Sequence, residues 1–270
     1  MTSPHRSIAE STLRLRHRKS AEKLLPEQLD ALREGFAKIQ ALSDRNGFAF
    51  WAGKHGVPDD DCEHSSEELG YDNLFLPWHR AYLYQLELAL QTKVEGSFLP
   101  WWDWPASRVT GGIPIIFEDV EGELNPLAGF DLPPLPGNPP DWPGRTWREP
   151  GDPELLPEVG LIEEIIEQPN FDVFSEELEV RLHNGVHGWV GGTMRWQATA
   201  AYDPIFWAHH TMVDRIWSLW QGKHSSWGPR PELWNEPLKG LGMTVGKVLN
   251  TTALGYDYAA STEHRDPEKE

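Results

Sequence analysis

The fold is decided by the stretch Asp203-Pro204-Ile205-Phe206-Trp207-Ala208-His209-His210-Thr211-Met212-Val213-Asp214-Arg215-Ile216-Trp217. Asp203 before Pro204 predicts an N-cap followed by proline at the first helical position, so a helix should begin here. Residues at three- and four-residue spacing predict one buried stripe on that helix: Ile205, Phe206, His209, Met212, Val213, Ile216 and Trp217. A histidine pair in this stripe is either a hydrogen-bonded core histidine with a partly exposed neighbour, or a place where metal binds.

Composition predicts a globular protein without nucleic-acid or membrane partners. The 270 residues suffice for one substantial core, and 39% hydrophobic with 11% aromatic residues is typical of folded chains, so we predict one domain over 1–270. A formal net charge of -18 repels phosphate backbones. No window approaches the roughly 20 apolar residues that a membrane-spanning helix needs.

The N-terminus, residues 1–25, is predicted to be an arm. Residues Met1–Lys23 are basic, but no apolar segment or small-residue cleavage site follows them, so no signal peptide is expected. A cytoplasmic location is therefore expected, and export together with a partner that carries its own signal stays open. Cys62 is the only cysteine, which excludes an internal disulfide and makes its neighbours worth attention.

Two helices are predicted in the first third of the chain. Pro26 opens one whose apolar residues share a face, and Leu74–Leu90 forms the other. The apolar face of the second helix begins at His79, which should therefore point into the core. The segments around His55 and His64 are rich in Gly, Pro and Asp, and they predict a loop in which histidines on their own would face solvent.

A proline-rich segment then interrupts the helical pattern. It holds 12 of the 23 prolines between Pro105 and Pro157, so the segment 105–157 should contain no regular structure. Its aromatic residues are better explained by a long loop packed over one domain than by a linker, and such a loop either borders an active site or pads the surface. Phe98–Pro105 is predicted to be a packed turn whose tryptophans line a pocket or fill the core.

A second histidine pair lies in the last third of the chain. His183 and His187 are four residues apart in Ser175–Trp189, so both imidazoles should project from one helical face. Toward the C-terminus, Leu254–Tyr258 predicts a small strand or a packed tail, and residues 259–270 a frayed end.

Six histidines thus fall into two groups along the sequence: His55, His64 and His79, then His183, His187 and His210. No carboxylates accompany them at matching positions, which disfavours magnesium and calcium, and a single cysteine cannot build a thiolate zinc site. Zinc, nickel and copper stay open on this argument.

Two sequence motifs favour copper among these metals, because they resemble motifs of a known copper-binding family. Phe75-Leu76-Pro77-Trp78-His79-Arg80-Ala81-Tyr82-Leu83 and the stretch Asp203–Trp217 resemble the two copper signatures of the tyrosinase, catechol oxidase and haemocyanin family. The similarity covers Trp51–Gln221 apart from the proline-rich segment. It implies a mainly α fold, in which a central four-helix bundle holds two copper ions, with long irregular loops and little β structure. It also implies dioxygen as co-substrate.

The resemblance further implies a ligand set. The first copper would be bound by His55, His64 and His79, and the second by His183, His187 and His210, with His210 rather than His209 as the liganding member of its pair. Cys62-Glu63-His64-Ser65-Ser66 is similar to a fungal motif in which the cysteine sulfur is bonded to the histidine ring as a thioether. One departure is a six-residue insertion, Glu67–Asp72, between that motif and the next helix.

The activity that the resemblance implies is phenol oxidation. Asn184 occupies the position of a family asparagine that, with a glutamate, orients a water toward the incoming phenol, and Glu179 is the best candidate for that glutamate. Phe206 matches a phenylalanine that stacks on ligand histidines. Arg195 and Gln197 are expected at the pocket mouth, where they would favour a polar or acidic phenol.

We therefore expect a tyrosinase that oxidises small o-diphenols to o-quinones and hydroxylates monophenols, with a copper-delivery protein as a further partner. A catechol oxidase or o-aminophenol oxidase without monophenolase activity is the alternative, and a haemocyanin-like oxygen carrier is the rival from another class. Only twelve residues follow Tyr256-Asp257-Tyr258, after which many family members carry a shielding domain. The enzyme is thus expected to be active on copper loading without proteolysis.

Overall fold

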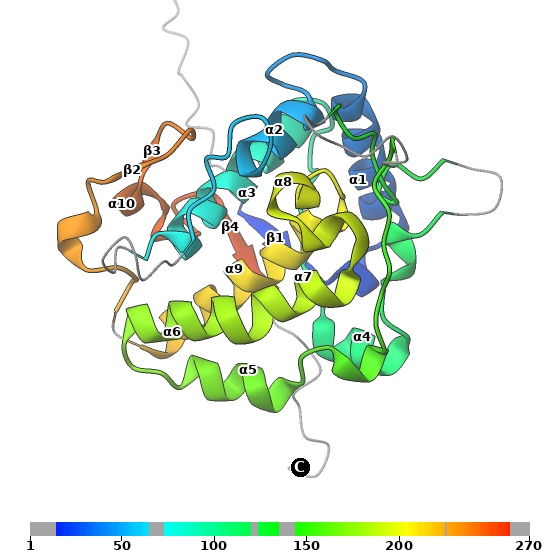
Figure 1. Ribbon diagram of the computed structural model, residues 1–270. Helices are drawn as coiled ribbons and strands as arrows, with labels where there is room; N and C mark the ends of the chain where they lie inside the picture. Colours follow the sequence, from blue (N-terminus) through cyan, green and yellow to red (C-terminus); the bar gives the residue numbers. More distant parts are fainter. Residues whose placement is uncertain (1–14, 65–72, 120–123, 135–143, 225, 260–270) are drawn as a thin grey trace, which may run out of the picture.

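The computed structural model describes residues 15–64, 73–119, 124–134, 144–224 and 226–259 (Figure 1). Its elements, in chain order, are β1 (Arg16–Arg18), η1 (Ala21–Lys23), α1 (Pro26–Gln40), α2 (Phe48–His55), α3 (Phe75–Gln91), α4 (Trp104–Thr110), η3 (Ile115–Phe117), η4 (Pro153–Leu155), α5 (Val159–Ile166), α6 (Phe171–Glu177), η5 (Leu178–His183), α7 (Asn184–Val190), η6 (Gly192–Arg195), α8 (Gln197–Ala200), α9 (Ile205–Lys223), η7 (Pro231–Leu233), β2 (Pro237–Leu238), β3 (Met243–Thr244), α10 (Val245–Val248) and β4 (Tyr256–Tyr258). The expected mainly α fold with little β structure is confirmed.

Helices α3 and α9 pack against each other in the middle of the molecule, with α2 above them and the run from α6 to α7 below (Figure 1). Every residue of α9 from Ile205 to Trp217 is buried, so the prediction of a single buried stripe is too narrow. A helix covered on all sides is typical of the centre of a domain. None of the helices in the described part of the chain is long and apolar enough to span a membrane.

The start of α9 differs slightly from the prediction. The helix begins at Ile205, one residue after the proline that was expected to open it. Asp203 still satisfies a free backbone donor, because its Oδ1 accepts a hydrogen bond from the Ile205 amide at 3.1 Å. The Arg148 guanidinium binds the same carboxylate through Nε at 2.8 Å, and this contact fastens the proline-rich segment to the first turn of α9.

The prediction that 105–157 contains no regular structure is wrong at its start. Helix α4 runs from Trp104 into the segment, and the Asp103 side chain caps it by accepting from the Ala106 amide at 3.2 Å. Pro105 is compatible with this helix because it stands in the first turn, where a backbone donor is not needed. Short 3₁₀ turns, η3 and η4, are the other regular elements in its described part, and residues 135–143 lie outside the described residues.

The loop predicted around His55 is in part a helix. His55 is the last residue of α2, whose aromatic and alanine side chains pack into the core although Gly53 lowers its helix propensity. Gly56 follows as the C-cap, and a Cβ at this position would lie 2.4 Å from the Ala198 carbonyl oxygen. The close approach of two backbones therefore requires glycine directly after the histidine.

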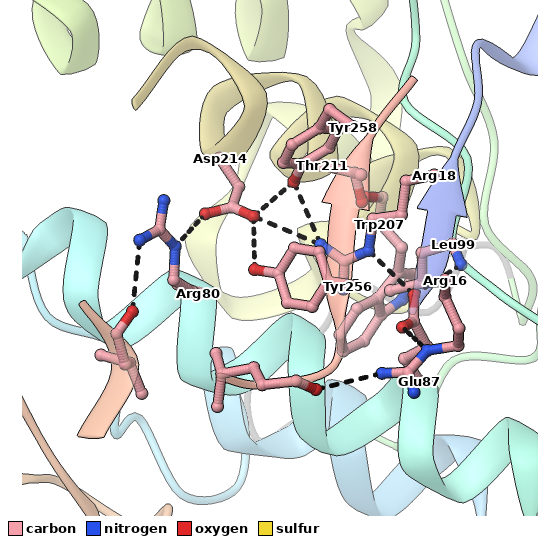
Figure 2. A network of polar contacts seen from close by, with 12 residues as sticks. Arg16, Arg18, Arg80, Glu87, Leu99, Trp207, Thr211, Asp214, Tyr256 and Tyr258 are labelled. Carbon is pink, nitrogen blue, oxygen red and sulfur yellow. Dashed lines mark hydrogen bonds and ion pairs between the residues drawn. The ribbon is translucent and has the colours of Figure 1, made fainter. Parts of the chain in front are cut away.

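Part of the N-terminal arm is also ordered. Strand β1 pairs in parallel with β4, with Arg16 opposite Tyr256, so the arm predicted over 1–25 is wrong for Arg16–Arg18 and for η1. The Arg18 side chain is fully buried, and its charge is compensated by Glu87 and Asp214 (Figure 2). The strand at the C-terminal end is present as predicted. The proposed insertion Glu67–Asp72, residues 260–270 of the end predicted to be frayed over 259–270, and residues 1–14 lie outside the described residues.

Candidate metal centre

The six histidines expected to bind metal meet in the middle of the molecule. They come from the end of α2, the segment after Cys62, α3, the end of η5, α7 and α9: His55, His64, His79, His183, His187 and His210. The rings of His79 and His210 are stacked with centroids 4.3 Å apart, so the helices α3 and α9 bring the two sequence groups into direct contact. On the other side, His183 Nε2 and His187 Nε2 lie 3.0 Å apart.

Hydrogen bonds at Nδ1 orient five of the six rings. Three backbone carbonyl oxygens accept from His55, His79 and His187, and they belong to Gln197 at 3.2 Å, Phe75 at 2.8 Å and Met194 at 2.8 Å. His183 Nδ1 donates to Asn184 Oδ1 at 3.0 Å, and His64 Nδ1 donates to Glu179 Oε1 at 2.9 Å. An imidazole that donates from Nδ1 keeps the lone pair on Nε2, and outer-shell partners of this kind are typical of metal-binding histidines.

The histidine nitrogens, with the Cys62 sulfur in one set, form clusters of the size that a metal ion requires. Ligand atoms lie within 4.8 Å of one another in three sets: His183, His187, His209 and His210; His55, His79 and His210; and His55, Cys62 and His64. His55 Nε2 and His210 Nδ1 are buried and find no hydrogen-bond partner among the described residues. Buried polar atoms without partners are rare, and a bound ion would satisfy His55 Nε2. The donor set of neutral imidazoles fits copper.

Burial keeps these imidazoles neutral. It lowers the pKa of His55, His79, His183 and His210 well below the ordinary value, and the neighbouring imidazoles lower it further. Burial likewise lowers the pKa of His187 to about 4. A histidine must be deprotonated to bind metal, so these five histidines are in the form that binds metal at neutral pH.

An aromatic shell surrounds the rings. Phe206 lies one helical turn before His210 and packs on its ring at 4.1 Å, and it also contacts the His55 ring at 4.7 Å. Phe75 contacts the His183 ring at 4.8 Å from α3. These contacts fix the rings sterically and exclude water from the inner side of the centre.

The helix that carries His183 is unusual. Between α6 and α7 the chain makes a π-helical segment, η5, and such segments occur frequently at functional sites. Glu179 lies in this segment and is buried, and its carboxylate is the partner of His64 Nδ1. One segment therefore supplies His183 to the second group and holds a histidine of the first, a connection that sequence spacing does not reveal.

A cavity of about 420 Å³ opens onto the histidines. Its lining includes Arg195 and Gln197, the two residues expected at a pocket mouth, together with Glu179 and Asn184. The Gln197 side chain donates to Asp60 Oδ1 at 3.0 Å, and Arg195 is exposed. The sequence offered no signal for the other wall residues, Gly188, Met194 and Ala200, because they lie in three separate elements, α7, η6 and α8.

His209 lies at the metal centre, although the sequence predicted no ligand role for it. It is fully buried, and neither ring nitrogen has a hydrogen-bond partner in the described part of the chain. Its ring stacks on His183 at 5.2 Å and lies near Trp104 at the same distance. The structure therefore places His209 beside the three histidines of the second group.

Comparison with known proteins identifies the family. The family model described as the common central domain of tyrosinase matches residues 45–131 and 136–223. The tyrosinase of Streptomyces glaucescens is 34% identical over 180 residues, which cover 58% of this chain and 65% of that protein. The A-type hemocyanin, units Ode to Odg, of Enteroctopus dofleini is 28% identical over 89% of this chain, but the chain covers only 21% of its length.

A solved structure agrees with these matches. The tyrosinase from Burkholderia thailandensis superposes with a TM-score of 0.75 at 25% identity, over 92% of this chain and 74% of that one. Two copper ions bound through histidines are the cofactor of this family, and the histidine clusters are able to hold them. The chain belongs to the tyrosinase family of type 3 copper proteins, which includes the hemocyanins.

Proposed function

We propose that this protein is a phenol oxidase that converts o-diphenols to o-quinones and hydroxylates monophenols. The observation that carries the proposal is the cavity: His55, His64, His183 and His187 line it, so a small phenol can reach the centre from outside. An oxygen carrier needs no such access for an organic substrate. Reversible oxygen binding is the second candidate function, because hemocyanins are among the relatives.

The metal ligands in this proposal are His55, His64 and His79 for one copper and His183, His187 and His210 for the other. Bound copper supplies the binding and activation of dioxygen. The chain's own residues orient the phenol: Gly188 and Ala200 belong to the cavity wall that receives its ring, and Arg195 at the mouth attracts an acidic substituent. Glu179 and Asn184 face the same cavity. The Glu179 carboxylate would take up the phenol proton, directly or through a water molecule that the Asn184 amide helps to orient.

Oxygen uptake by the copper-loaded protein tests the proposal. We expect consumption of dioxygen with a simple monophenol and, faster, with the matching o-diphenol. Uptake with the diphenol alone would make the protein a catechol oxidase and remove the proposed roles of Asn184 and Glu179 in monophenol hydroxylation. An o-aminophenol is included as a third substrate. Reversible oxygen binding without turnover of any substrate would contradict an oxidase and favour the carrier.

Glu179→Gln should separate proton transfer from ligand orientation. General base catalysis contributes typically about 10²–10⁴-fold, so we expect the monophenol rate to fall by roughly 100-fold while the diphenol rate changes little. Glu176→Gln, an exposed carboxylate on the same helical run, is the matched control and should leave both rates unchanged. An equal loss on both substrates would instead mean that Glu179 acts only by holding His64.

A further inference from the structure

A second cavity, of about 400 Å³, lies between the helices α4, α5 and α9, which are labelled in Figure 1. Three residues of α9 line it, Met212, Arg215 and Leu219, and their spacings of three and four place them on one helical face. Among the described residues, this cavity shares no lining residue with the cavity that opens onto the histidines. A molecule bound here would therefore be distinct from the phenol of the proposed oxidation.

Arg215 is a buried cation whose guanidinium finds no acceptor in the described part of the chain. The residue is 9% exposed, its Nε is enclosed without a hydrogen-bond partner, and the Trp101 ring covers one face of the guanidinium at 4.1 Å. By contrast, the fully buried Arg18 and Arg80 both form ion pairs with Asp214. An arginine keeps its charge and its donors in a protein, so Arg215 requires an anionic acceptor.

The charges around Arg215 decide the kind of anion. Burial lowers the pKa of Arg215, and the charges of Asp103 and Tyr258 raise it, so Asp103 lies near the guanidinium although the two residues form no ion pair. Asp103 and Glu163 line the same cavity, so two acidic side chains accompany one basic side chain. A plain carboxylate would add a third negative charge, whereas an α-amino acid carries an ammonium group that compensates its own carboxylate.

We propose that this cavity binds a free aliphatic α-amino acid, whose carboxylate pairs with Arg215 and whose ammonium group faces Asp103. Both groups are attached to the same carbon atom, so they match a base and an acid that lie near each other without pairing. Glu163 is exposed and lies at the rim, where its charge attracts the ammonium group. The aliphatic side chain of the ligand lies against apolar residues of α5 and α9: Val159, Ile162, Ile166, Met212 and Leu219.

Isothermal titration calorimetry of the copper-loaded protein with L-leucine tests the site. We expect a dissociation constant of about 1 mM or below. Isocaproate, which is leucine without its amino group, and isoamylamine, which is leucine without its carboxylate, should each bind at least about tenfold more weakly, because each leaves a charged side chain of the cavity without its partner. Leucine has no phenol ring, so its binding is independent of the proposed oxidation.

Two variants locate the binding within the molecule. Arg215→Gln removes the positive charge and should weaken leucine binding by at least about tenfold. Ala106→Phe keeps Arg215 but fills the cavity from α4, so it should abolish the binding. Val109→Phe is the matched control and should bind leucine as the wild type does, because Val109 is on the same helix, is 86% exposed and does not line the cavity. The midpoint of thermal unfolding verifies that each variant is folded.

Three results would overturn the amino-acid site. The first is the absence of leucine binding by the wild-type protein well above the expected dissociation constant. The second is binding that stays unchanged in Arg215→Gln or in Ala106→Phe, which would place leucine elsewhere, for example on the copper ions, which amino acids also bind. The third is isocaproate that binds as tightly as leucine, which would mean that the ammonium group and the acidic side chains take no part in recognition.

Discussion

Replacing His210 by alanine is expected to lower the copper content from two ions to one per chain and to reduce oxygen uptake with an o-diphenol by at least about 100-fold. Loss of an outer-shell partner of a metal ligand already costs roughly 10–100-fold, and His210 is proposed to be a ligand itself. The residue belongs to two of the three clusters and stacks directly on His79. Its removal should therefore disturb the first group as well as the second. Metal analysis and an oxygen electrode measure the two effects.

The neighbouring His209 provides the matched control. It is equally buried and also lies in the cluster of His183, His187 and His210, but the resemblance assigns the ligand role to His210. His209→Ala should therefore keep two copper ions, since His183, His187 and His210 remain. If His209→Ala loses a copper ion while His210→Ala retains both, the assignment within the pair is reversed.

The elements that hold the histidines could largely be predicted from the sequence. Helices α3 and α9 follow from their spacing of apolar residues, and the pair His183 and His187 follows from a separation of four. The resemblance then selected six histidines, and the structure brings all six together. Helical spacing indicated only His79, His183, His187 and His210, because a helix fixes which side chains share a face, whereas His55 and His64 were selected by the resemblance alone.

Other features depend on contacts that no local pattern encodes. Three of the five Nδ1 acceptors are backbone carbonyls, and the one that binds His55 belongs to Gln197, 142 residues further along the chain. Every residue has a carbonyl, so its sequence does not single out an acceptor. In the sequence Glu179 resembles the nearby Glu176 and Glu177, but the π-helical segment η5 places its carboxylate beside His64 Nδ1. Arg16–Arg18 was interpreted as a polar arm because charged residues are rarely buried unless they are paired, and the partners lie about 70 or more residues further along the chain.

Asp214→Asn is expected to lower the free energy of unfolding by about 3–5 kcal/mol, because it breaks a buried network of charges by removing one partner. Asp214 is 2% exposed and accepts hydrogen bonds from Arg80 Nε, from Arg18 Nη1 at 3.2 Å and from the Tyr256 hydroxyl at 2.7 Å (Figure 2). The Tyr258 hydroxyl also donates to it. The neutral amide would leave two buried guanidiniums short of negative charge, and the midpoint of thermal unfolding should fall by on the order of 10 °C. Thermal unfolding of the copper-free protein measures this shift.

Two comparisons decide whether the ionised carboxylate is responsible. Asp257→Asn, between the two tyrosines on β4, changes a partly exposed carboxylate paired with His17 and should alter stability by less than about 0.5 kcal/mol.

Burial alone would raise the pKa of Asp214, but the charges of Arg80 and Arg18 outweigh it and hold the pKa below the ordinary 3.8. The unfolded chain therefore takes up the proton first, so this contribution is complete above pH 3.8 and is lost as pH falls through the folded pKa. The stability difference between wild type and Asp214→Asn should thus be constant from pH 7 to about 5 and shrink below about 4. A difference that stays constant in acid would mean that packing and the neutral hydrogen bonds, rather than the charge of Asp214, hold β1 and β4 to the core.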